Sequence, residues 1–334
     1  MDYALGLLPL DDRARKDQEK IKAAAAPYSH RGNVSPWYEW TKEGDMTIAT
    51  WDSSFDAQLA RWAETREKYR KKGLNLDPWN VFRAIPKRQK KNDVLFWDQG
   101  SRPSCAAHGS AHAYQCAMIT AIALGSPLVY DAVNPIYSFY LARGGNYAGG
   151  VDLITMYREI NENGFYPVSA VGENNISVEG DKLTQYKQEA KKHQAGIIPI
   201  EGSPDELVDK IFRACRGLCS VCFGSGIFYT SSTMDKNGVK VMARPSRGGH
   251  AQAFTAWKRV GREEYIFNIN SHGPNYTGDA TPDVGAWITK DILATYARDM
   301  SNYGDPWVVF PEGETISNDS FVNTFTLPKD DEQA

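Results

Sequence analysis

The chain has 334 residues, of which 42% are hydrophobic and 12% aromatic, so it is long enough for two average domains and can form a substantial core. Its net charge of -3 argues against nucleic acid or a membrane surface as the main partner. No run of apolar residues approaches the ~20 needed to span a membrane. Its five cysteines do not make a disulfide framework in a chain of this length.

Residues 1–84 are predicted to form an N-terminal extension with helices at 11–26 and 55–73. Four apolar residues of the second helix fall on one stripe: Phe55, Leu59, Trp62 and Tyr69. From residue 66 to residue 91, ten basic residues oppose two acidic ones. This stretch is either a solvated helix face with a linker or a dock for an acidic protein partner. Residues 1–84 are therefore a docking arm or a cleaved prosegment, and both readings stay open.

Residues 85–311 are predicted to fold as one α+β domain, with a helical half at 85–205 and a β half at 206–311. Turn and capping residues delimit helices at 104–125, 134–145, 152–164 and 203–217. Apolar, β-branched and aromatic runs predict strands at 218–232, 238–245, 250–260 and 264–270. An Asn-Gly pair at 237–238 is typical of a turn between two of them. Residues 312–334 are polar and are predicted to be a tail.

A candidate nucleophile, Cys105, lies at the start of the predicted helix 104–125. Cysteine attacks carbonyl groups as a thiolate, and that form is favoured at a helix N-terminus and beside an imidazolium. His250 follows a Gly-Gly turn at the start of a predicted strand, and Asn270 at a strand end can orient its ring. The side-chain amide of Gln99, in a turn before the helix, and the backbone N–H of Cys105 can bind an oxyanion.

The order Gln, Cys, His, Asn resembles that of the papain family of cysteine peptidases. "DQGSRPSC" (98–105) resembles that family's cysteine motif, "GGHAQAF" (248–254) its histidine motif, and "YIFNINSHGPNYTG" (265–278) its asparagine motif. "NYAGGVD" (146–152) is similar to its Gly-Gly stretch, and "RGLCSVCFGSGIFYTSS" (216–232) to the strand that leads toward the histidine. The resemblance covers residues 85–311.

The resemblance implies a papain-like two-lobed fold. Its helical lobe would have a central helix starting at Cys105, its other lobe an antiparallel β-barrel-like sheet, with the active-site cleft between them. It also implies hydrolysis of peptide or protein substrates without a cofactor. Cys105 would be the nucleophile, His250 the acid/base, Asn270 its orienter and Gln99 an oxyanion donor. Three further residues would contact the substrate. Gly149 and Gly150 would bind the backbone of the substrate, and Ala251 would line the specificity pocket.

Three positions depart from the family pattern. The glycine before the Ser-Cys pair is replaced by Pro103, and the aromatic residue after the cysteine is Ala106. The aromatic residue of the family's Asn-Ser-Trp-Gly motif is His272, which we expect to line the cleft wall rather than act as a second base. This replacement thins the apolar cover over the hydrogen bond between Asn270 and His250.

No metal site is predicted. His108 and His112 share one helix face, but no third ligand is apparent, so we expect them to be buried and hydrogen-bonded. Cys219 and Cys222 are three apart on a predicted strand, where their side chains point to opposite faces. A single metal ion could therefore not easily be coordinated by both thiolates.

In a second hypothesis, the papain-like domain is a structural component of a large assembly, such as a phage virion, and its catalytic site is weak or vestigial. The start of the sequence has no basic region followed by a long apolar one, so no signal peptide is expected. The odd number of cysteines fits a reducing compartment. We therefore expect a cytoplasmic or virion-associated protein.

Overall fold

The computed structural model describes residues 7–25, 71, 76–123, 126, 128–146, 148–174, 180–273 and 284–311. The predicted helix at 55–73 with its apolar stripe and the predicted tail at 312–334 lie outside the described residues, apart from Lys71. The described helices are α1 (Asp12–Ala25), α3 (Pro78–Ala84), α4 (Cys105–Ala123), α5 (Pro135–Ala142), α6 (Leu153–Asn163), α7 (Val168–Val171), α8 (Gly180–Ala190), α9 (Pro204–Arg216) and α10 (Lys290–Met300), with short 3-10 turns at Lys87–Gln89 and Lys191–His193. The strands are β1 (Ala195–Pro199), β2 (Ser220–Met234), β3 (Lys240–Val260), β4 (Glu263–Ile269), β5 (Gly285–Ile288) and β6 (Trp307–Pro311).

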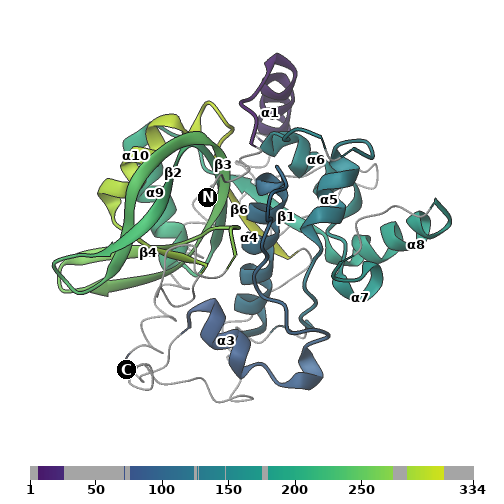
Figure 1. Ribbon diagram of the computed structural model, residues 1–334, viewed down its shortest axis with the longest axis horizontal. Coiled ribbons are helices and arrows are strands. Elements are labelled where there is room, and N and C mark those ends of the chain that lie inside the picture. Colours follow the sequence, from purple (N-terminus) through teal and green to yellow (C-terminus); the bar gives the residue numbers. More distant parts are fainter. Residues whose placement is uncertain are drawn as a thin grey trace.

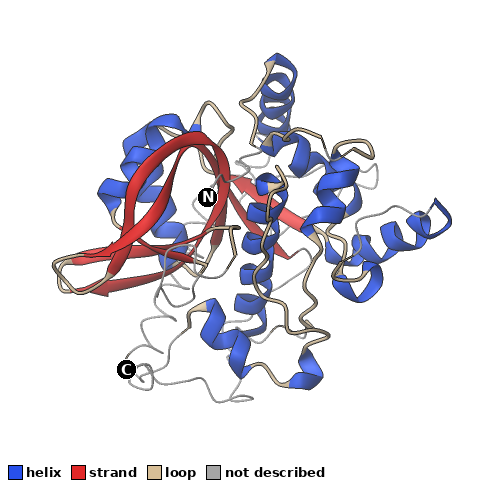
Figure 2. Ribbon diagram, viewed as in Figure 1, coloured by secondary structure: helices blue, strands red, loops and turns tan. Residues whose placement is uncertain are grey.

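Helices and sheet form two parts with α4 between them (Figure 1). Helices α5 to α8 lie on one side of α4, and the ribbon of β2 to β4 with α9 and α10 lies on the other, while β1 and β6 run past α4 between the two sides (Figure 2). The α+β fold expected from the papain resemblance is thus confirmed, with a central helix that begins at Cys105 and an antiparallel sheet beside it.

The sheet has the strand order β1-β6-β2-β3-β4-β5, and neighbouring strands are antiparallel. The long ribbon of β2 and β3 dominates it, with His250 opposite Ser225. Strand β3 also pairs with β5 at Val241 and Trp287, so the sheet curls toward a barrel. Residues 238–245 and 250–260 were expected to be separate strands. They belong to one strand, because β3 pairs with β2 on both sides of Gly248 and Gly249, where the register shifts in a bulge.

Helix α4 is buried on nearly all sides, as expected for a helix without a polar face. Small residues allow this, because they let neighbouring backbones approach closely. A Cβ atom on Gly109 would lie 3.1 Å from the backbone nitrogen of Gln252 and 3.3 Å from the carbonyl carbon of Ala251. The contact of Gly109 with β3 therefore sets the distance between the helix and the strand that carries His250.

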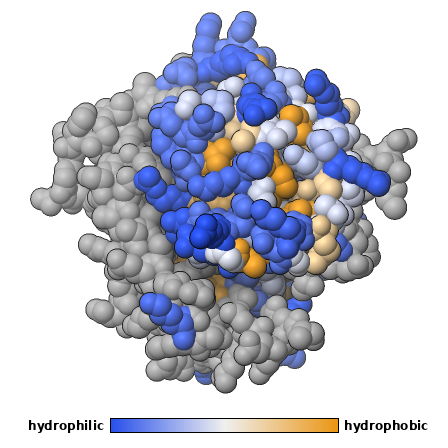
Figure 3. All heavy atoms as spheres, turned by 90° about the vertical axis from the view of Figure 1, so that its left-hand side faces the viewer, coloured by the Kyte–Doolittle hydropathy of each residue, from blue (hydrophilic) through white to orange (hydrophobic). Residues whose placement is uncertain are grey.

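Helices α9 and α10 pack on a second core with the sheet, which includes Phe212, Phe254 and Tyr296. The helix predicted at 203–217 is α9, and it begins with a capping box in which Ser203 and Glu206 are bonded reciprocally. On the molecular face over this region, apolar side chains are scattered among hydrophilic ones (Figure 3). Among the described helices, not one combines the length and apolar character needed to cross a membrane.

Replacing Gly109 with valine is expected to destabilise the fold by about 1–3 kcal/mol, because the added atoms overpack the contact with β3. Thermal unfolding measures this change. Thr120→Val is the matched control, since Thr120 lies on the same helix but is partly exposed. Equal stability of the Gly109→Val variant and the wild-type protein would contradict the close contact.

Candidate active site

Cys105 is the first residue of α4 and is fully buried. Its neighbour across the helix turn, Gly109, lies against Ala251 and Gln252 of β3. The first turn of α4 therefore runs beside the strand segment that holds His250. The structure thus brings the predicted nucleophile and the predicted base to one junction of helix and sheet.

The ring of His250 is held by Asn270, which follows β4. Nε2 of His250 lies 2.8 Å from Oδ1 of Asn270, and the backbone N–H of Ser271 donates to the same oxygen at 2.7 Å. Because that oxygen accepts from the Ser271 amide, Nε2 of His250 must carry the hydrogen. Nδ1 of neutral His250 is then an unprotonated acceptor, buried and without a hydrogen-bond partner among the described residues.

Gln99 is joined to the same strand end. Its backbone N–H donates to the carbonyl oxygen of Ser271 at 2.7 Å, and Oγ of Ser271 donates to its Oε1 at 2.5 Å. Because Oε1 accepts from Ser271, the side-chain amide of Gln99 has a fixed orientation. Its Nε2 donates to the carbonyl oxygen of Arg102 at 2.8 Å.

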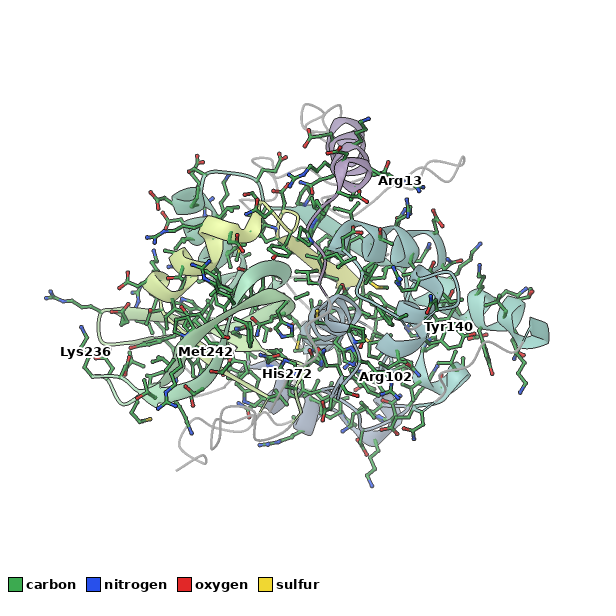
Figure 4. All side chains as sticks on the ribbon, turned by 45° about the horizontal axis from the view of Figure 1, so that its top comes forward. Arg13, Arg102, Tyr140, Lys236, Met242 and His272 are labelled. Atoms are coloured by element: carbon green, nitrogen blue, oxygen red, sulfur yellow. The ribbon has the colours of Figure 1, made fainter. Side chains whose placement is uncertain are left out.

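His272 covers the ring of His250. The two imidazoles are stacked, with centroids 4.9 Å apart and planes within 7° of parallel. Phe228 meets His250 edge-on at 5.7 Å. Figure 4 labels His272 on the sheet side of α4. An imidazole therefore supplies a flat cover at the position where the family pattern has an aromatic residue, and the stack limits the rotation of the His250 ring.

His108 and His112 are buried and hydrogen-bonded in the structure. Nδ1 of His108 lies 2.9 Å from the carbonyl oxygen of Ser104, and Nε2 of His112 accepts the backbone N–H of Trp97 at 2.9 Å. In the described part of the chain, no group of three or more His, Cys, Asp or Glu residues is placed to hold a metal ion.

Of the predicted substrate-binding residues, Ala251 lies at this junction, and Gly149 and Gly150 directly precede Val151. Ala251 follows His250 on β3 and is fully buried opposite Gly224. Gly149 and Gly150 lie in the loop between α5 and α6, and Gly149 has a φ of +72°, a conformation that favours glycine. Val151, next along the chain, forms an isolated parallel bridge with Leu7.

Burial keeps the titratable groups of this region neutral. It lowers the pKa of His108 and of His250 to about 4, and the bond from Asn270 partly opposes the shift at His250. Burial also lowers the pKa of His112 and of His272 to about 3, and neighbouring histidines add to both shifts.

Three other cysteines are kept as thiols by burial. It raises the pKa of Cys222 to about 11 and of Cys116 to about 12, and it raises that of Cys219 well above its usual value. All five cysteines are buried and none forms a disulfide.

The sequence did not indicate the role of Ser271 or of Leu7. Ser271 sits between Asn270 and His272, where its hydroxyl fixes the Gln99 side chain. The sequence feature that could have indicated this role is the position of Ser271 directly after Asn270. Leu7 contacts Gly249 and Val151 from far away in the chain, and no local pattern marks such a contact.

No family model matches the chain, and no curated protein matches it. Among solved structures, xylellain, a cysteine protease from Xylella fastidiosa, is similar at 18% identity and a TM-score of 0.46, over 69% of this chain and 88% of that one. Procathepsin B S9 from Trypanosoma congolense is similar at 10% identity and a TM-score of 0.45, over 92% and 99%. Digestive procathepsin L 3 of Tenebrio molitor larval midgut is similar at 12% identity and a TM-score of 0.43, over 90% and 93%. The chemistry of this chain must therefore be argued from its own residues.

The buried histidines predict acid sensitivity. The unfolded chain binds protons at these four residues below about pH 6.5, while the folded chain does not until about pH 4 to 3. The contribution of these histidines to the free energy of unfolding is therefore fully present above about pH 6.5 and is lost as the pH decreases. Because unfolding then takes up as many as four protons, the free energy of unfolding falls by up to about 5 kcal/mol per pH unit. Urea unfolding between pH 7 and pH 5 measures the slope.

His112→Gln supplies the matched control for this slope. Glutamine retains an acceptor for the backbone N–H of Trp97 but does not titrate. The slope should decrease by about 1.4 kcal/mol per pH unit, the contribution of one proton. An unchanged slope in this variant would show that His112 does not drive the acid sensitivity.

Proposed function

We propose that the protein is a thiol peptidase or amidase that hydrolyses peptide bonds through Cys105, His250 and Asn270. The observation that carries the proposal is the bond between Nε2 of His250 and Oδ1 of Asn270. This bond leaves Nδ1 of His250 as the basic atom, at the junction where α4 presents Cys105. The helix N-terminus is also the position in a helix that stabilises a thiolate.

The first half-reaction transfers the acyl group to the enzyme. The Sγ proton of Cys105 passes to Nδ1 of His250, and the sulfur attacks the carbonyl carbon of the substrate. The Gln99 amide and the backbone N–H of Cys105 donate to the oxyanion. When the C–N bond breaks, the leaving amine takes the proton from Nδ1, and a thioester remains on Cys105.

The second half-reaction releases the acyl group. Water gives a proton to Nδ1 of His250 and attacks the thioester carbonyl. Breaking the C–S bond releases the carboxylic acid product, and the proton returns to the sulfur of Cys105. Because burial lowers the pKa of His250 to about 4, its imidazole is a neutral acceptor near neutral pH.

Gly149, Gly150 and Ala251 are proposed to position the substrate. Gly149 and Gly150 have no side chains, which favours pairing of their backbone with an extended peptide. Ala251 places a small side chain beside His250, where a larger one would reduce the space for substrate. The alternative role in a virion or another large assembly stays a prediction from the sequence.

Alkylation with iodoacetamide at pH 7, followed by peptide mass spectrometry, tests the proposal. Cys105 should react faster than Cys116, Cys219 and Cys222, whose raised pKa values keep them protonated. His250→Ala should remove this preference, because the thiol loses its proton acceptor. Equal and slow labelling of all cysteines in the wild-type protein would overturn the assignment of Cys105 as nucleophile.

Gln99 is predicted to contribute to the rate of hydrolysis of a dipeptide amide. Gln99→Ala should lower kcat by about 10²–10³, as expected for the loss of one oxyanion donor. Ser271→Ala should lower kcat less, because it frees the orientation of the Gln99 amide but retains its donor. A loss from Ser271→Ala that exceeds the loss from Gln99→Ala would contradict this assignment.

A further inference from the structure

One side chain ties the loop between α5 and α6 to the end of α5. Arg143 is the C-cap residue of α5, and Nη2 of its guanidinium donates to the carbonyl oxygen of Ala148 at 2.7 Å. Oδ1 of Asn146 accepts the backbone N–H of Ala148, also at 2.7 Å. Both backbone polar groups of Ala148 are therefore held by side chains, directly before Gly149 and Gly150.

The end of α5 gives Arg143 a fixed starting point. The backbone N–H of Gly145 donates to the carbonyl oxygen of Tyr140 at 2.9 Å, and that of Gly144 donates to the carbonyl oxygen of Leu141 at 2.8 Å. These two bonds form a Schellman motif, which ends a helix with a residue of positive φ. Gly144 supplies that conformation, with a φ of +63°. The chain changes direction there, and the loop that follows returns to the guanidinium of Arg143.

The positive charge of Arg143 acts on the Ala148 carbonyl without competition from a described carboxylate. Its Nε is buried and has no hydrogen-bond partner among the described residues. The bond to Ala148 is charge-assisted, and such a bond is stronger than one between two neutral groups. It also polarises the peptide group that Ala148 shares with Gly149, which makes the N–H of Gly149 a better donor.

The same bond sets the direction of the Gly149 N–H. In a trans peptide group, the form of almost all bonds that do not precede proline, the C=O and the N–H point to opposite sides of the chain. The Ala148 carbonyl points to Arg143, so the N–H of Gly149 points away from it. Gly149 is exposed, and a Cβ atom on it would lie 3.7 Å from Nη2 of Arg143. The guanidinium therefore lies against one side of the loop, and the donor faces the other.

We propose that Arg143 is a positioning residue for substrate, which acts by orienting and polarising the peptide group between Ala148 and Gly149. The inference rests on the proposed function, in which the backbone of Gly149 pairs with an extended peptide. Arg143 touches neither the substrate nor Cys105. It therefore affects the binding of the substrate backbone and not the chemistry of the thiol.

The test measures binding in the Cys105→Ala protein, which lacks the proposed nucleophile. Isothermal titration gives the Kd of a blocked dipeptide amide for this parent protein and for the parent with Arg143→Met or Arg158→Met. Arg158 of α6 is the matched control, because its contact is a partly exposed ion pair with Asp17 at 3.3 Å. Arg143→Met should raise Kd roughly two- to tenfold, the range for loss of one hydrogen bond, and Arg158→Met should leave it unchanged.

Two further variants distinguish the hydrogen bond from the packing of a long side chain. Arg143→Lys retains a charged donor and should restore part of the affinity that Arg143→Met loses. Asn146→Ala frees the N–H of Ala148 and should weaken binding without any change at Arg143. Circular dichroism verifies that each variant is folded.

Kinetics of the proteins that retain Cys105 give a second readout. Arg143→Met should raise KM for the dipeptide amide and leave kcat unchanged, because the reacting groups are untouched. The rate at which iodoacetamide labels Cys105 should also stay the same. A decrease in kcat with an unchanged KM would contradict a role in positioning.

The outcomes separate this inference from the proposed function. Equal Kd values for the parent and for Arg143→Met overturn the positioning role, as do equal losses in the two methionine variants or the absence of binding to the parent. If Arg143→Met alone of these two weakens binding and yet the protein with Cys105 hydrolyses no peptide amide, the positioning role stands and the peptidase function fails. If hydrolysis is observed and Kd does not depend on Arg143, the peptidase function stands and the positioning role fails.

Discussion

The hydrogen bond between His250 and Asn270 is the interaction on which the proposed chemistry of this protein depends. It selects one tautomer of the imidazole and leaves Nδ1 as the basic atom. Asn270 is itself fixed, because its backbone N–H donates to Val284 at the start of the β5 region and its side-chain oxygen accepts from Ser271. The same strand end holds Gln99 by two hydrogen bonds. A single turn after β4 therefore orders both the base and the proposed oxyanion donor.

Burial is the second constraint. Helix α4 approaches β3 closely because Gly109 has no side chain, and the site consequently lies inside the core rather than on the surface. A buried imidazole is costly to charge, so four histidines near α4 are neutral at neutral pH. The stacked ring of His272 belongs to this environment: as a neutral imidazole it covers His250, and as a cation it would repel a charged His250. The arrangement suits chemistry near neutral pH.

The sequence predicted the parts of the fold that local patterns encode. Capping and stop residues indicated α4, α5, α6 and α9, and the Asn-Gly turn indicated the ribbon of β2 and β3. The division of β3 into two strands was wrong, because β3 pairs with β2 on both sides of the bulge at Gly248 and Gly249, so these glycines do not end the strand. The contributions of β1, β5 and β6 were missed, since strands this short acquire their stability from partners distant in sequence.

Motif order predicted candidate members of the site, and the structure adds the contacts among these candidates. Four residue types in sequence order identify candidates, but the tautomer of His250 follows only from the two donors that converge on Asn270. The stack of His272 on His250 and the hydroxyl of Ser271 are likewise properties of three-dimensional placement. The contact of Leu7 joins residues more than two hundred positions apart, which no local sequence pattern encodes.

Nitrogen-15 NMR of the His250 ring tests the central claim most directly. In the wild-type protein near neutral pH, the structure predicts a hydrogen on Nε2 of His250 and none on Nδ1, because Oδ1 of Asn270 accepts from Nε2 and burial lowers the pKa of the ring to about 4. In Asn270→Ala, Nε2 loses this acceptor, so the preference for the Nε2–H tautomer should decrease. An Nδ1–H tautomer in the wild-type protein, or the same tautomer preference in both proteins, would contradict the selection of the tautomer by Asn270.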